Sequence, residues 1–134
     1  MQDQYVKLGQ LLNRQNRLVI ELVALGQQQL QALKNDDTDE LFRVAGEQER
    51  LSRKLETLQQ QHQEVCRQLA SELGLDPSAG LKELLPRAGS NSTELFNVAK
   101  ELRKNHSALQ DLNDLNRMLV KQSLSLINRM LQAI

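Results

Sequence analysis

The sequence predicts an all-α fold, an elongated antiparallel bundle of three long helices with a short helical insert before the last helix. The composition favours helices over strands, because 27 leucines and 17 glutamines stand against only 10 valines and isoleucines, and aromatic residues make up 2%. Apolar residues recur at steps of three and four, the repeat of one helix face, and capping signals separate the runs. We expect a single domain, 1–134, with long helices at about 2–34, 38–73 and 92–133 and the insert at 75–91.

The first two predicted helices form a hairpin. Residues 2–34 carry apolar side chains in two neighbouring rows, and the polar stretch 34–37 then interrupts the pattern. Asp37 and Glu40 have the spacing at which an aspartate caps the free amides of a helix start and a glutamate reaches back to it. A short turn between the two helices is therefore predicted here.

The second predicted helix has the most regular pattern, a heptad seam about 50 Å long at about 1.5 Å per residue. Its polar members are Gln48 and His62, and polar seam residues restrict register at a cost in stability. Gly74 tolerates a left-handed helix end, so the helix should stop there. The seam consists of Leu41, Val44, Gln48, Leu51, Leu55, Leu58, His62, Val65 and Leu69.

The insert contains both prolines of the chain. Asp76 followed by Pro77 has the form of a cap before a proline at the first helical position, which predicts a short helix over 77–85. The next proline ends that helix. Asn91, with a glutamate three residues later, predicts the start of the last helix.

Charge and composition exclude several classes of function. The 17 basic and 17 acidic side chains cancel, so no excess positive charge is available to bind a nucleic-acid backbone or an anionic lipid surface. The first residues lack a basic segment followed by an apolar one, and no apolar run approaches the length of about 20 residues that spans a bilayer. A single cysteine agrees with a reducing compartment. We expect a soluble, intracellular protein that inserts into no membrane.

The sequence contains no convincing catalytic, nucleotide or metal motif. His62 and Cys66 lie four residues apart on one helix face, but the other histidine is distant and no second cysteine exists, whereas a zinc site needs about four ligands. A seam histidine and a small buried thiol explain the pair better. The glycines form no phosphate-binding loop. We therefore expect no enzyme activity, no metal and no cofactor.

Three glycines lie inside predicted helices, where each costs about 1 kcal/mol relative to alanine. They are Gly9, Gly26 and Gly46. We expect them to allow close approach of a neighbouring helix or to soften the helix locally.

The last helix carries more apolar surface than one helix contact requires. On a helical projection with about 100° per residue, Leu119 is placed at 0°. One row of apolar side chains, the inner row, lies within about 40° of Leu119, and a second row, the outer row, lies between about 60° and 140°. The resulting arc is about 180° wide, whereas one contact needs about 100°. A cargo-binding face, a homo-oligomer contact and burial against both other helices each explain the excess. The inner row is Leu112, Leu115, Leu119, Leu126 and Met130, and the outer row is Val120, Leu124, Ile127, Leu131 and Ile134.

Residues 112–129, LNDLNRMLVKQSLSLINR, resemble the C-terminal signature of the FlgN family of flagellar export chaperones. The resemblance lies in paired asparagines, a leucine pair and a following serine-leucine segment, and it extends less specifically to the length and glutamine-rich character of the chain. It implies a cytoplasmic chaperone that binds the C-terminal helical segments of hook-filament junction proteins, keeps them soluble and delivers them to the flagellar type III export gate. It implies no enzymatic activity.

By position, the cargo-binding segment of that family falls on the outer row, and the signature polar residues fall on Asn113, Asn116 and Ser123. The asparagines can equally serve as hydrogen-bonding groups between helices, because a polar group within an apolar arc must find a partner. From Leu95 onward the sequence has no tyrosine, so a docking contact to the export gate through a tyrosine phenol cannot be placed there. A self-assembling structural coiled coil that uses the same apolar surface is the alternative function.

Overall fold

The computed structural model describes residues 1–133, which form helices and turns and no strand. Three helices are long: α1 (Gln2–Lys34), α2 (Thr38–Glu72) and α4 (Ser92–Ala133). Between α2 and α4 lie the short helix α3 (Leu81–Leu84) and the 3-10 turns η1 (Leu85–Arg87) and η2 (Gly89–Asn91). The predicted all-α class is confirmed, and each long helix begins and ends within one residue of its predicted bounds.

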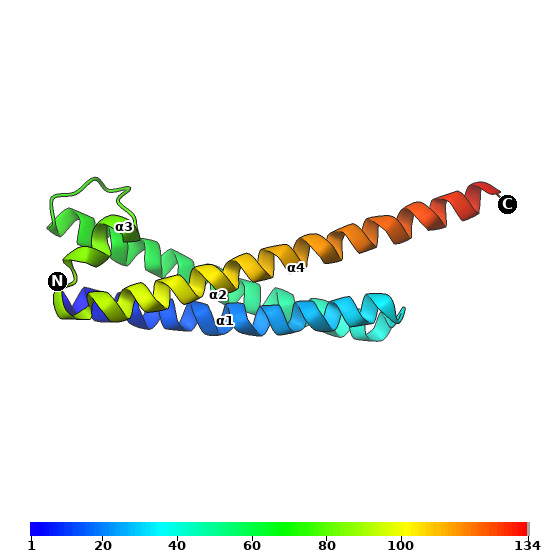
Figure 1. Cartoon of the computed structure of the whole chain (residues 1–134), viewed down its shortest axis with the longest axis horizontal. Helices are drawn as coiled ribbons and strands as arrows, with labels where there is room; N and C mark the ends of the chain where they lie inside the picture. The colour runs from blue at the N-terminus through cyan, green and yellow to red at the C-terminus, as the bar shows by residue number, and fades with distance from the viewer. Residues whose placement is uncertain (134) are drawn as a thin grey trace.

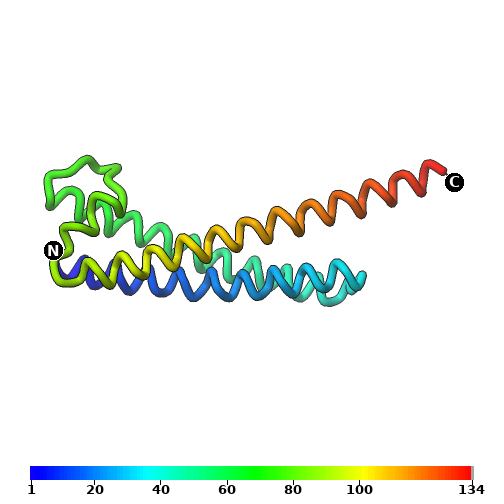
Figure 2. Tube along the Cα trace, in the orientation of Figure 1, coloured from blue at the N-terminus to red at the C-terminus, as the bar shows by residue number. Residues whose placement is uncertain are grey.

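The long helices run up, down and up. α1 and α2 form an antiparallel hairpin, and α4 runs along α1 in the same direction (Figure 1). α1 packs against both other long helices. Toward its C-terminal end, α4 moves away from the hairpin and extends past the turn between α1 and α2, as the Cα trace also shows (Figure 2). A three-helix bundle over the whole length is therefore not confirmed.

Buried apolar side chains form two clusters along α1. The larger cluster lies at the N-terminal end of α1 and includes side chains of α2, the insert and the first turn of α4. The smaller cluster lies near the α1–α2 turn, and its buried members are Leu22, Leu25, Val44 and Leu51. One end of the molecule is thus held together by buried side chains of every long helix, whereas the buried members of the smaller cluster come from the hairpin and α4 contributes the partly buried Leu109.

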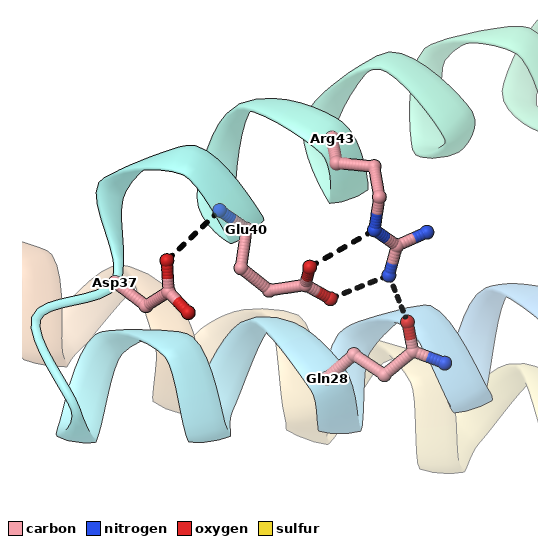
Figure 3. A network of polar contacts seen from close by, with 4 residues as sticks. All are labelled: Gln28, Asp37, Glu40 and Arg43. Atoms are coloured by element: carbon pink, nitrogen blue, oxygen red, sulfur yellow. Dashed lines mark hydrogen bonds and ion pairs between the residues drawn. The ribbon is translucent and has the colours of Figure 1, made fainter.

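The turn between α1 and α2 is capped by Asp37, as predicted. Its carboxylate accepts a hydrogen bond from the Glu40 amide over 3.1 Å (Figure 3). The reciprocal half of the predicted capping box is not formed, because the Asp37 amide donates instead to the carbonyl of Ala32. The Glu40 carboxylate accepts two hydrogen bonds from the Arg43 guanidinium, which also donates to Gln28 over 2.7 Å and so connects α2 to α1.

α2 ends as predicted before Gly74, whose φ of 69° is the left-handed conformation that glycine adopts without strain. The predicted helix over 77–85 is wrong at its start, because α3 begins only at Leu81. Asp76 does not cap that helix. Its carboxylate accepts hydrogen bonds from the amide and the hydroxyl of Ser78, over 2.8 and 2.6 Å, and this closes a local turn.

Replacing Tyr5 by phenylalanine should lower the free energy of unfolding by about 1 to 2 kcal/mol, because it leaves a buried acceptor unpaired. The buried Tyr5 hydroxyl donates to the carbonyl of Leu84 over 2.7 Å and joins α1 to the insert. Urea unfolding followed by circular dichroism measures the effect, since the substitution removes the single tyrosine that fluorescence would report. An unchanged unfolding midpoint would show that this hydrogen bond contributes nothing to stability.

Candidate functional site

Two glycines allow α4 to pack closely against α1. A Cβ atom added at Gly9 would lie 3.2 Å from Cδ2 of Leu95, and one added at Gly26 would lie 2.6 Å from Cδ2 of Leu112. The two glycines are as far apart along α1 as the two leucines are along α4, as expected for parallel helices in a fixed register. The predicted close approach is confirmed at these two positions. Gly46 has no such neighbour within 4 Å.

Asn116 joins α4 to the hairpin through a polar layer. Its side chain is 2% exposed, and its Nδ2 donates to the Gly26 carbonyl over 3.0 Å and to Oε1 of Gln29 over 3.3 Å. The same Gln29 oxygen accepts a hydrogen bond from Gln48 of α2 over 2.9 Å. Asn116 therefore acts as a hydrogen-bonding group between helices, and the predicted seam residue Gln48 is satisfied by a specific network.

Beyond the layer around Asn116, α4 extends past the end of α1. α4 has 42 residues against 33 in α1, and the two helices start at the same end of the molecule (Figure 1). Leu33, in the last turn of α1, borders a hollow of about 200 Å³ together with Leu119 of α4. Every residue of 120–133 is exposed. We call this segment, residues 120–133, the tail.

The tail presents the predicted outer row to solvent. Val120, Leu124, Ile127 and Leu131 are 38%, 56%, 51% and 64% exposed. The last member of the row, Ile134, lies outside the described residues. Several aliphatic side chains exposed side by side on one segment are uncommon on a monomer and mark an interaction surface.

The inner row was predicted to face the bundle, and this prediction is wrong for Leu115, Leu126 and Met130. Leu126 and Met130 are 54% and 59% exposed, and Leu115 is also exposed, whereas Leu112 and Leu119 are half-buried. The cause is the length of α1, which ends before it can cover the tail. Sequence reasoning therefore missed Leu126 and Met130 as surface residues, because helical periodicity alone does not show where the neighbouring helix ends beside α4.

The three signature polar residues have different surroundings. Only Asn116 is buried, while Asn113 and Ser123 are exposed. Asn113 borders a hollow of about 410 Å³ that also touches Gln48 and Arg117. The structure thus gives Asn116 a packing role and leaves the other two side chains accessible.

His62 and Cys66 lie where α2 faces α1. The Gln15 amide donates to Nδ1 of the half-buried His62 over 3.0 Å, and burial lowers the pKa of this histidine. Burial raises the pKa of the Cys66 thiol to about 11, so the thiol is protonated at neutral pH. In the part of the chain that the structure describes, no three histidine, cysteine or acidic side chains are grouped as metal ligands would be.

The protonation of His62 should couple stability to pH. Because burial depresses its pKa in the folded state, the unfolded chain takes up a proton first as pH falls below about 6.5, and stability decreases. Protonation also removes the Nδ1 acceptor that Gln15 uses. The loss of unfolding free energy between pH 7 and pH 5 should be smaller in His62→Gln than in the wild type, as measured by urea titration. Equal losses in both proteins would contradict this assignment.

Comparison with known proteins identifies a family. A sequence model for the family described as FlgN protein matches residues 1–134. No curated protein and no solved structure matches the chain. None of the described helices combines the length and apolar character of a membrane span.

Proposed function

The chain belongs to the FlgN family, a family of flagellar export chaperones, and we propose that its tail is the surface that binds cargo. The cargo is the group of unassembled hook-filament junction proteins, bound through their C-terminal helical segments. The chaperone keeps these proteins soluble in the cytoplasm and delivers them to the flagellar type III export gate. This role requires binding and release and no catalytic site.

The observation that carries the proposal is the exposure of the tail. Its aliphatic side chains lie on a helix that continues past the hairpin, so a partner can approach them without displacing α1 or α2. An amphipathic helix of the cargo would place its apolar face against these side chains and exchange two solvent-exposed surfaces for one buried contact. The core of the hairpin stays intact during such an exchange, which suits repeated binding and release.

Docking to the export gate cannot use the single tyrosine of the chain, because its side chain is buried. The single tyrosine of the chain, Tyr5, lies in the core at the opposite end of α1 from the tail. We therefore assign no contact through a tyrosine phenol to the gate on α4.

The proposal is tested by co-expressing the full chain with the C-terminal segment of each candidate junction protein. We expect a stable complex that co-purifies and a cargo segment that stays in the supernatant at concentrations where it precipitates alone. A chain that binds none of these segments, and instead forms concentration-dependent oligomers through the tail, would support the alternative of a self-assembling coiled coil.

A further inference from the structure

The exposed apolar surface of the tail is too wide for one partner helix. At about 100° per residue, the inner-row side chains Leu126 and Met130 lie within about 20° of Leu119, whereas the outer row extends to about 140°. Within the described part of the tail, the members of both rows are exposed, as their fractional exposures show. One helix contact covers about 100°, so a single docked helix leaves one row in water.

The inner row continues the line along which α4 packs on α1. Upstream, Leu112 meets Gly26, and Leu119 and Leu33 border the same hollow at the last turn of α1. A partner helix on the inner row of the tail would therefore extend the path of α1 beyond its end. A second helix, on the outer row, would cover the remaining surface.

The charges beside the apolar arc indicate the chemistry of the partner. After Asp114 the chain contains no acidic side chain, but it contains Arg117, Lys121 and Arg129. On the helical projection, Arg117 and Lys121 follow the outer edge of the arc at about 160° and 200°, and Arg129 lies beyond the inner edge at about 280°. Arg117 has a weak, exposed ion pair with Asp114 at 3.8 Å.

A second copy of this chain is a poor occupant of the tail. Two tails packed together would place basic side chains beside basic side chains along the edges of the contact, where helix pairs are normally matched in charge. A partner whose helices carry acidic residues at these flanks would form attractive pairs instead.

We propose that the tail binds two amphipathic helical segments of one cargo chain, one on each row, with acidic residues flanking their apolar faces. This inference rests on the proposed function and specifies how the cargo occupies the site. It predicts a complex of one chaperone with one cargo molecule in which both rows become buried.

The experiment compares two double variants of the full chain. Leu126→Glu with Met130→Glu disrupts the inner row, and Leu124→Glu with Ile127→Glu disrupts the outer row. Ser125→Ala with Gln132→Ala changes the polar face without adding a charge beside the basic side chains and serves as the control. Calorimetric titration measures the affinity of each variant for a full-length junction protein and for its isolated C-terminal helix.

We expect each row variant to bind the full-length cargo at least a hundredfold more weakly, and the polar-face control to stay within a few fold of the wild type. The isolated helix should be affected by one row variant only. If the inner-row variant binds the full-length cargo like the wild type while the outer-row variant does not, the two-helix arrangement is wrong and the cargo-binding function stands. If neither variant changes binding, the proposed function itself fails. A wild-type tail-to-tail dimer at micromolar concentration in sedimentation would overturn the choice of occupant.

Discussion

Replacing Leu124 and Ile127 together by glutamate is expected to weaken binding of the junction-protein cargo at least a hundredfold while the chain stays folded. Both side chains are more than half exposed in the free protein, so the substitutions place charges in water and remove nothing from the core. Fully burying one aliphatic side chain contributes about 1.5 to 3 kcal/mol, and the loss of two such contacts corresponds to a factor of a hundred or more in affinity. Calorimetric titration against the C-terminal helical segments measures this loss.

The matched control is Leu119→Glu, which lies on the same helix and borders a hollow together with the last turn of α1. Leu119 is half-buried beside Leu33, so a charge there should lower the unfolding midpoint in a thermal melt. The Leu124/Ile127 variant should melt like the wild type. Intact cargo binding by that folded variant would remove the outer row from the binding surface.

Replacing Gly26 by valine is expected to lower the free energy of unfolding by about 2 to 3 kcal/mol, through overpacking of the contact between α1 and α4. A Cβ atom at this position already lies 2.6 Å from Cδ2 and 3.1 Å from Cγ of Leu112, so the leucine cannot relieve the overlap by moving its far end alone. Separating the helices would also stretch the hydrogen bond from Asn116 to the Gly26 carbonyl. Urea unfolding followed by circular dichroism measures the change.

Gly46→Val is the matched control, because a Cβ atom added at Gly46 meets nothing within 4 Å. Its stability should stay within about 0.5 kcal/mol of the wild type, since valine and glycine differ little in helix propensity. Leu112→Ala should recover part of the loss in the Gly26→Val background, because the two residues are in direct contact. Equal effects of valine at both glycines would show that helix propensity, and not close packing, controls these positions.

The helix boundaries could be predicted because local signals set them. Asp37 caps the start of α2 through its own carboxylate, and Gly74 follows the end of α2 in a left-handed conformation. Each acts within one turn of the helix, so the residue type alone indicates the boundary. The start of α3 could not be predicted in the same way. Asp76 before a proline fits both a helix cap and a local turn, and the hydrogen bonds to Ser78 select the turn.

The exposure of the apolar side chains of α4 could be predicted only in part, for a related reason. Helical periodicity places Leu124 and Leu126 on different rows of α4, but it does not state where the neighbouring helix ends. That limit depends on the register between α1 and α4, which Gly26 and Asn116 fix through contacts between residues far apart in the chain. The sequence therefore identifies both apolar rows, whereas only the structure shows that Leu112 and Leu119 are half-buried and that Leu126 and Met130 are exposed.

Hydrogen–deuterium exchange of the full chain, with and without bound junction-protein cargo, tests the location of the binding surface most directly. Cargo should slow exchange of the amides in the tail, residues 120–133, and leave the core of the hairpin at its exchange rates in the free protein. A different region is the hollow of about 550 Å³ between α2 and α4, which His62 and His106 border. Protection of that hollow, with unchanged exchange in the tail, would contradict the account.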